Sequence, residues 1–282
     1  MSRSPSSSAQ RAREEVAARL RELRLDAGLS GRALSRRAGW HESKTSRIES
    51  AKQAAADADI TAWCRACGAE GQTADLIAAS RAADSMYVQW RRLHRTGMRR
   101  AQTSRIPLYE STSLMRVYTC TVVPGLVQTP AYAAALMGAI TGFQKTPDDV
   151  AEAVAARMER NRVLHGGGHR FALVLEESVL HQRIGDAEVM AGQLGHLLSV
   201  MSLPSVSLGV IPHTARRGVW PLETFTLFDS VRVHVELLSA QVTVTAPGEV
   251  ELYERAFAEQ ARAAVFGRAA RRVITAARDA LE

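Results

Sequence analysis

Hydrophobic positions in the first third of the chain recur every three or four residues, as they do along amphipathic helices. Ser30 can cap a short helix, and Gly39 separates that helix from a second short one that begins at His41. Three further helices are predicted around this pair, at 12–27, 57–67 and 73–83. The pattern therefore predicts five helices in the N-terminal part of the chain.

The two short helices on either side of Gly39 have the pattern of a helix-turn-helix. Apolar or small residues occupy the positions where two crossed helices pack together: Leu29, Ala33, Leu34, Ala38, Thr45 and Ile48. Polar residues occupy the outward positions of the second helix. In a helix-turn-helix the second helix lies in the major groove of DNA, so this segment is predicted to bind DNA.

The second part of the chain mixes helix and strand patterns. Helices are predicted at 108–118, 130–140, 146–164, 189–201, 248–266 and 268–281. Strands are predicted at 171–175, 206–211, 223–229 and 231–237, and the last two form a hairpin around Asp229. The strand–helix–strand order between 171 and 211 is compatible with a parallel βαβ crossover. We expect a mixed α/β domain with a small sheet.

These patterns divide the chain into two domains. We predict a mainly α helix-turn-helix domain over 12–84 and a C-terminal mixed α/β regulatory domain over 106–282. Residues 1–11 are predicted to be a disordered tail, and 85–105 a connecting helix or linker. The regulatory domain would bind a ligand, bind a partner protein or dimerise.

The charge of this 282-residue chain supports a nucleic-acid partner for its N-terminal part. Residues 1–105 hold 20 Lys and Arg against 11 Asp and Glu, a net charge of +9. Residues 106–282 hold 16 against 18, a net charge of −2. Solvated arginine-rich helices would give the same balance, but together with the helix-turn-helix pattern it favours phosphate binding.

The cysteines and the apolar segments favour a cytoplasmic protein. Three cysteines are too few for a disulfide framework and fit a reducing compartment. The Ser-rich N-terminus lacks the apolar core of a signal peptide. No run of about 18 apolar residues occurs, so we expect no membrane span and no membrane partner.

The predicted recognition helix offers side chains for bases and for phosphates. Glu42 can accept a hydrogen bond from cytosine, Arg47 can donate two to guanine, and Ser43 can contact either kind of base. Alternatively, Arg47 and Glu49 are solvated or paired along the helix. The predicted DNA-binding residues are Arg32, Arg36, His41, Glu42, Ser43, Lys44, Arg47 and Lys52.

A second candidate site centres on the segment 124–132. Its Pro-Gly and Thr-Pro pairs are typical of a turn followed by a helix start, which is the simpler interpretation. Its polar side chains can instead serve a pocket or a partner surface, with Tyr118 and Trp220 in an apolar wall. The predicted ligand- or partner-binding residues are Gln128, Thr129, Tyr132 and Trp220.

No catalytic or metal motif stands out. Cys64 and Cys67 form a CxxC without a second ligand pair nearby, which favours packing over zinc binding. Histidines and glutamates such as Glu176 and Glu236 are scattered without ligand or catalytic spacing. We expect no enzyme activity, no cofactor and no metal; an enzyme with a DNA-targeting domain is the alternative.

The helix-turn-helix segment resembles the lambda-repressor-like (XRE-type) family. Gly39 and the sequence Ser46-Arg47-Ile48-Glu49 match that family's turn and the end of its recognition helix. The chain departs from the family at Gly31, where a phosphate-contacting Gln is frequent. It also departs at Ala51, where a Gly often ends the recognition helix.

The sequence Pro124-Gly125-Leu126-Val127-Gln128-Thr129-Pro130-Ala131-Tyr132-Ala133 resembles a motif of actinobacterial two-domain regulators, the WhiJ-like group. These proteins join an XRE-type N-terminus to a C-terminal domain of unknown function. The likeness extends over nearly the whole chain from about Leu20, although Asn161 replaces a Gln expected after Arg157 and Arg160. It implies a cytoplasmic transcriptional regulator, often encoded near a small partner protein.

Together these features predict a sequence-specific regulator that binds double-stranded DNA. A small helix-turn-helix reads only a few base pairs, so a homodimer on a two-fold-related site is expected. Its C-terminal domain would sense a small-molecule effector or bind a partner protein. An antitoxin-like protein that binds a partner and regulates its own gene is the other alternative.

Overall fold

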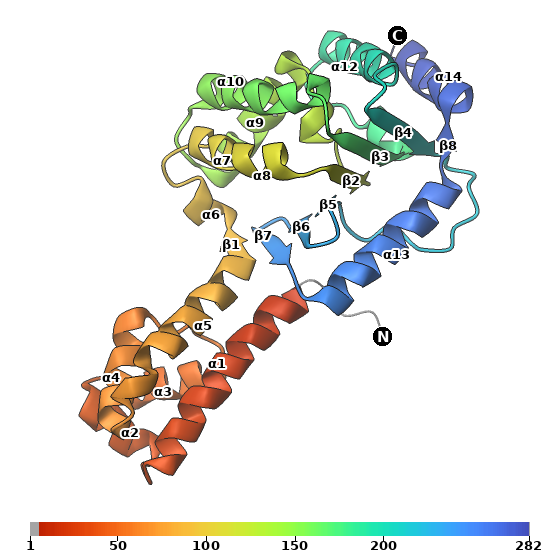
Figure 1. Ribbon diagram of the computed structural model, residues 1–282. Helices are drawn as coiled ribbons and strands as arrows, with labels where there is room; N and C mark the ends of the chain where they lie inside the picture. The colour runs from red at the N-terminus through yellow and green to blue at the C-terminus, as the bar shows by residue number, and fades with distance from the viewer. Residues whose placement is uncertain (1–5, 282) are drawn as a thin grey trace. The chain divides into compact units, whose positions relative to one another are not determined.

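The computed structural model describes residues 6–281, which form two compact units divided between Val88 and Gln89 (Figure 1). A short strand, β1 (Tyr87–Gln89), lies at this division. Among the described residues, no helix has both the length and the apolar character that crossing a membrane requires.

The first unit is a bundle of helices around one apolar core. Its elements are α1 (Ser6–Asp26), α2 (Gly31–Ala38), α3 (Glu42–Glu49), α4 (Asp57–Cys67), a 3-10 turn (Glu70–Gln72) and α5 (Thr73–Met86). Trp63 lies at the centre of the core, and its indole Nε1 donates to the carbonyl of Leu20 at 2.9 Å. This bond gives the buried indole N–H the partner that it needs.

Helix α1 begins earlier than the sequence pattern predicts. Residues 6–11, assigned to a disordered tail, form its first turns, while residues 1–5 lie outside the described part of the chain. Ala9, Gln10 and Arg11 are good helix formers, and Gln10 donates to Glu14 one turn later at 2.9 Å. A polar composition alone therefore did not prevent helix formation.

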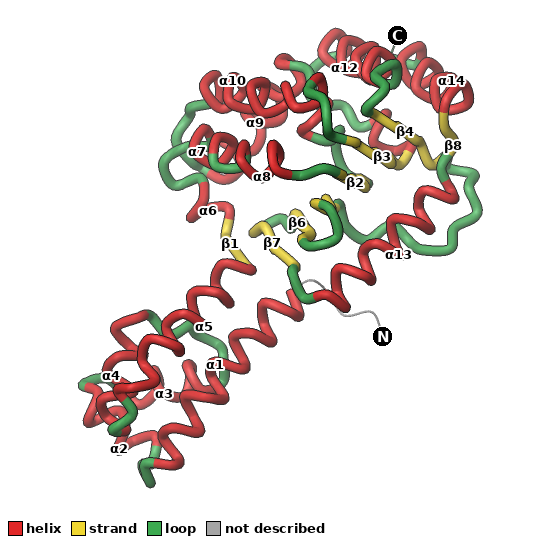
Figure 2. Tube along the Cα trace, viewed as in Figure 1, coloured by secondary structure: helices red, strands yellow, loops and turns green. Residues whose placement is uncertain are grey.

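The second unit is built on a twisted sheet with helices on both faces (Figure 2). Seven strands of an eight-stranded sheet belong to it, in the order β7-β6-β5-β2-β3-β4-β8. They are β2 (Leu114–Thr119), β3 (Arg170–Glu176), β4 (Val206–Ile211), β5 (Phe225–Phe228), β6 (Arg232–Glu236), β7 (Ala240–Val244) and β8 (Val265–Phe266). Strands β2, β3 and β4 are parallel, whereas β5, β6 and β7 form an antiparallel meander beside them.

Helices cover the parallel strands from two sides. Helices α12 and α14 lie together on one face of β3 and β4, and α13 lies across the other face (Figure 1). The helices of this unit are α6 (Trp90–Leu93), α7 (Arg99–Thr103), α8 (Ile106–Ser111), α9 (Pro130–Gln144), α10 (Val150–Asn161), α11 (Glu177–His181), α12 (Ala187–Val200), α13 (Pro247–Ala263) and α14 (Gly267–Asp279). Two 3-10 turns occur at Gly125–Val127 and Arg162–His165.

The structure confirms the predicted fold class, a helical first part and a mixed α/β second part. It also confirms the βαβ crossover, because β3 and β4 are parallel neighbours with α12 between them in sequence. The hairpin of β5 and β6 turns at Asp229, whose φ of +50° is in the left-handed region.

The segment 108–118 is the clearest error of the sequence-based prediction. It contains the end of α8 and then β2, a strand in the middle of the sheet, rather than one helix. Met115 and Val117 face one side of β2 and are buried, and Tyr118 is buried on the other side. A strand buried on both faces lacks the alternation that identifies half-exposed strands.

Other boundaries differ because tertiary contacts decide them. The segment 85–105, predicted as a connecting helix or linker, contains β1, α6 and α7, and most of it belongs to the second unit. Helix α10 begins at Val150, because the carboxylate of Asp149 instead accepts the backbone N–H groups of Met98 and Arg99 at 2.7 and 2.8 Å. Strands β7 and β8 were not predicted.

The core of the first unit gives a stability prediction. Replacing Trp63 with Ala should lower the free energy of unfolding of that unit by about 3–5 kcal/mol, because it leaves a large cavity. Trp220, 57% exposed, is the matched control, and Trp220→Ala should cost less than about 0.5 kcal/mol. Calorimetric unfolding of the full chain measures both, and equal losses in the two variants would contradict the assignment of the core.

Candidate functional site

The helix-turn-helix is formed by α2, the turn around Gly39, and α3. Ser30 caps α2, because its Oγ accepts the N–H of Ala33 at 3.1 Å. Gly39 ends α2 with a φ of +77°, a conformation that costs a glycine little. His41 caps α3 through Nδ1, which accepts the N–H of Ser43 at 3.2 Å. The sequence therefore determines both ends of the turn locally.

A chain of hydrogen bonds joins α2 to α3. Ser35 donates its hydroxyl proton to the carbonyl of Gly31 at 2.8 Å, so it must accept the bond from Thr45, at 2.7 Å. Thr45 in turn accepts the indole N–H of Trp40 at 2.9 Å. Because Ser35 and Thr45 are buried and fully bonded, they hold α3 at one angle and position against α2.

An ion pair fixes the C-terminal end of α3 against α1. Nε and Nη2 of Arg24 donate to the carboxylate of Glu49 at 2.5 and 3.1 Å, and Nη1 donates to the carbonyl of Leu29 at 2.7 Å. The pKa of Arg24 is raised, chiefly by its hydrogen bond to Glu49. Glu49 therefore has a structural partner inside the unit.

The predicted DNA-binding side chains lie on the outer surface of this unit, with one difference. Arg32, Arg36, His41, Glu42, Ser43, Arg47 and Lys52 are exposed. Among the described residues, the side chain of Arg47 has one hydrogen bond, which its Nε donates to Gln53 at 3.0 Å. Lys44 differs: its ammonium pairs with Asp59 at 2.6 Å and lies over the ring of Trp40, so it is already engaged inside the unit. Ser46, which the sequence analysis did not select, is also exposed on α3.

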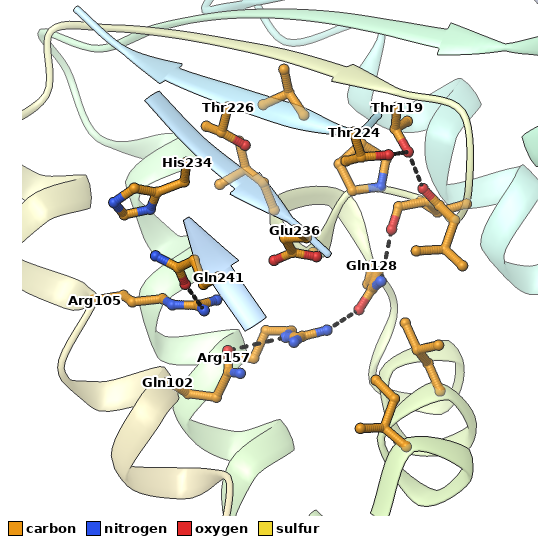
Figure 3. A pocket seen from close by; sticks show the side chains of 18 of the residues that line it. Gln102, Arg105, Thr119, Gln128, Arg157, Thr224, Thr226, His234, Glu236 and Gln241 are labelled. Carbon is orange, nitrogen blue, oxygen red and sulfur yellow. Dashed lines mark hydrogen bonds between the residues drawn. The ribbon is translucent and has the colours of Figure 1, made fainter. Parts of the chain in front are cut away.

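The second unit encloses a cavity of about 450 Å³ between α7, α8, α9, α10 and the strands β2, β5 and β6 (Figure 3). Much of its wall is apolar, including Val117, Leu126, Leu136, Ile140 and Phe225. Phe143 and Leu238 also line it and are 73% and 82% exposed, which places them at the opening. The volume is within the about 300–1,000 Å³ of typical small-molecule sites.

Three arginines meet the polar end of this cavity. Arg157 lies between two amide side chains, donating Nε to Gln102 at 3.2 Å and Nη1 to Gln128 (Figure 3). Arg160 donates to the same Gln102 oxygen at 2.9 Å and lies 4.5 Å from the ring centroid of Tyr109. Arg105 donates to Gln241 at 2.5 Å. All these acceptors, the ring face of Tyr109 included, are neutral.

These arginines have no carboxylate partner. Within residues 6–281, no Asp or Glu oxygen lies within 4.0 Å of a guanidinium nitrogen of Arg105, Arg157 or Arg160. Burial, followed by the charges of Arg160 and Arg105, lowers the pKa of Arg157 to about 9. Glu236 also lines the cavity, but it is exposed. The site therefore has an excess of positive charge.

The structure separates the four residues predicted to bind a ligand or partner. Gln128 lines the cavity, and its Nε2 donates to the carbonyl of Val123 at 2.7 Å. Thr129 caps α9, and Tyr132 is buried with its hydroxyl accepting the N–H of Val123 at 3.3 Å. Both hold the local structure, and, contrary to expectation, neither lines the cavity. Trp220 is exposed and is not part of the lining, contrary to expectation, because it lies on the loop between β4 and β5.

The sequence analysis missed the polar residues that define the cavity: Gln102, Arg105, Arg157 and Arg160. In the structure Ala153, Arg157 and Arg160 lie on one face of α10, and Ala153 and Arg160 are buried there. The sequence analysis did not predict this face as buried, so the two arginines gave no signal of a site.

Two neighbouring glutamates, Glu176 and Glu177, differ in their contacts. Glu176 is buried, accepts two bonds from Arg217 at 2.6 Å each, and accepts the hydroxyl of Tyr118 at 2.7 Å. Glu177 lies beside His181 and His213, with one ligand atom of each within 4.8 Å of the others. Glu177 also accepts the backbone N–H of His213 at 2.6 Å. The first arrangement is a closed ion pair; the second is a surface cluster of residue types that bind transition metals.

The geometry defines a class: a helix-turn-helix DNA-binding protein with a separate α/β unit that contains a cavity. Comparison with family models agrees, since residues 15–77 match a helix-turn-helix domain. Residues 108–276 match a domain of unknown function, DUF5753. This match covers more than half of the chain, which therefore belongs to the DUF5753 family. No curated protein matches the chain.

The cavity gives a prediction about pH. Burial, together with the charges of Arg105 and Arg232, lowers the pKa of His234 to about 3. The folded protein therefore keeps His234 neutral below pH 6.5, where the unfolded chain takes up a proton, so stability falls as the pH falls. One such group contributes up to about 1.4 kcal/mol per pH unit between pH 6 and 4.

Replacing His234 with Gln should remove this contribution and make the loss of stability below pH 6 shallower. Denaturant unfolding of the full chain at pH 7, 6 and 5 measures the slope for both proteins. His165→Gln, at an exposed histidine, is the matched control and should keep the wild-type slope. Parallel slopes in wild type and His234→Gln would show that His234 is not responsible.

Proposed function

We propose that this chain is a sequence-specific transcriptional regulator of the XRE type, similar to the WhiJ-like group. Helix α3 reads operator DNA, and the second unit binds a small-molecule effector in its cavity. The observation that carries the DNA-binding part is the exposed polar face of α3, held rigidly by the Trp40–Thr45–Ser35 bonds. Preorganised side chains lose less entropy when they bind.

The exposed side chains suit the two tasks of a DNA interface. Glu42, Ser43 and Arg47 lie on α3 and provide an acceptor, a hydroxyl and a bidentate donor for base edges. Arg32, Arg36 and Lys52 lie outside α3 and carry charge for phosphates. The protein acts as a homodimer in the cytoplasm, because one short helix reads too few base pairs for operator specificity.

The cavity favours a small-molecule effector, rather than a partner protein, as the ligand of the second unit. Its size and mixed lining are those of small-molecule sites. A partner protein is the second candidate, and the exposed Trp220 and Leu222 on the loop after β4 are the surface that favours it. The proposal includes no catalysis.

The experiment that tests DNA binding begins with chromatin immunoprecipitation and sequencing to find an operator. Arg47→Ala should then weaken operator binding by about 1–3 kcal/mol, or about 5- to 150-fold, because a bidentate base contact is lost. Fluorescence anisotropy with the full chain and labelled operator measures the affinity.

The control is Arg65→Ala, which removes an exposed arginine of α4 outside the helix-turn-helix. It should change the affinity less than about twofold, and both variants should keep wild-type thermal unfolding. An operator with two-fold symmetry supports the dimer. Equal affinities of wild type and Arg47→Ala would remove Arg47 from the interface.

A further inference from the structure

The strongest unexplained feature of the molecule is the positive charge enclosed in the second unit. Arg160 is 2% exposed, and its Nε is buried without a hydrogen-bond partner among the described residues. Arg157 uses Nε and Nη1 on two neutral amides and leaves Nη2 without an acceptor in the same set of residues. Buried charges are normally paired, so an anion is the group that this site lacks.

The local backbone makes room for these two guanidinium groups. A Cβ added at Gly125 would lie 3.3 Å from Nη2 of Arg160 and 3.5 Å from Nη1 of Arg157. Asn161 helps hold this turn, because its Nδ2 donates to the carbonyl of Gly125 at 2.8 Å. The arginines are therefore held in a fixed place against the 3-10 turn rather than reaching into solvent.

The apolar part of the cavity lining indicates the chemistry of the rest of the ligand. From the arginines, the wall continues over Leu126, Leu136, Ile140 and Phe225 to the exposed Phe143 at the opening. Glu236 is the one carboxylate among the lining residues, and it stands against three arginines. A ligand that fits both ends carries an acid group on an apolar body.

We propose that this cavity binds an amphipathic organic anion, with its acid group at Arg157 and its apolar body along Leu126, Leu136 and Phe225. Nη2 of Arg157 donates to the acid group, while Arg105 and Arg160 add positive potential. The acid group has equivalent oxygens, as a carboxylate or a phosphate monoester does. This inference rests on the proposed effector site and specifies its ligand class.

The test compares acids with alcohols that share the same apolar body. Octanoate, octyl phosphate and octanol form one set, and 4-phenylbutyrate and 4-phenylbutanol another. Isothermal titration calorimetry on the full-length wild type should show that at least one acid binds about tenfold or more tightly than its alcohol. The relative affinities of octanoate and octyl phosphate distinguish a carboxylate ligand from a phosphate ester.

Arg157→Gln should reduce this preference for the acid to less than about threefold, because the amide keeps hydrogen bonding but removes the charge. Arg183→Gln removes an exposed arginine outside the cavity lining and should keep the wild-type preference. If Arg157→Gln does not fold, the wild-type comparison of acid and alcohol still tests whether the cavity prefers an anion. Acids that bind no more tightly than their alcohols, or no binding by any acid, would overturn the proposal.

A second measurement separates this inference from the proposed function. The tightest acid is added to the wild-type complex with operator DNA, and the affinity for DNA is measured by anisotropy. An acid that binds at Arg157 but leaves DNA affinity unchanged would keep the anion site and reject the effector role. An alcohol that binds as tightly and changes DNA affinity would keep the effector role and reject the anion site.

Discussion

The way in which α7, α10 and the turn after β2 meet depends on two arginines, one buried and one half-buried, that donate to amide oxygens. The side-chain oxygen of Gln102 in α7 accepts from both Arg157 and Arg160 of α10. Gln128, from the turn that follows β2, accepts from Arg157 as well. Three segments distant in sequence therefore meet at one pair of guanidinium groups. Because amides satisfy hydrogen bonds without neutralising charge, the site is ordered and still positive.

In the first unit, by contrast, the buried charge has a partner of opposite sign. Arg24 is paired with Glu49, and the link between α2 and α3 uses neutral hydroxyl and indole groups. That arrangement has its charge satisfied within the chain, so it serves to hold α3 in place. In the second unit, Arg157 and Arg160 form no ion pair with a carboxylate of the described residues, and Glu236 is the one carboxylate that lines their cavity. The Arg24–Glu49 pair stabilises the fold of the first unit. The arginines of the second unit leave positive charge that a bound anion could neutralise.

The helix-turn-helix could be predicted from sequence because its determinants are local. Ser30, Gly39 and His41 bond to residues two to four positions away, and the apolar spacing repeats within two turns. The central strand β2 could not, because its six residues, four of them buried, are equally compatible with a short buried helix. The cavity joins Gln102, Gln128 and Arg157, which are far apart in sequence and share no motif. For Trp220 the assumption that an aromatic residue lines a pocket was wrong, since the loop after β4 places it in solvent.

The energetic cost of this site is the strongest argument that it has a role. A buried charge without a partner destabilises a fold, and well-packed apolar residues in its place are often neutral or stabilising. Earlier on the same helix, Ala153 and Val150 pack in an apolar cluster with Met98 and Met137, whereas Arg157 and Arg160 bring charge to the inside of the unit. Sites that break a local rule in this way are commonly functional. A bound anion would neutralise this charge, so that the same arginines stabilise the folded state instead of destabilising it. Ligand binding should therefore raise the free energy of unfolding of the second unit.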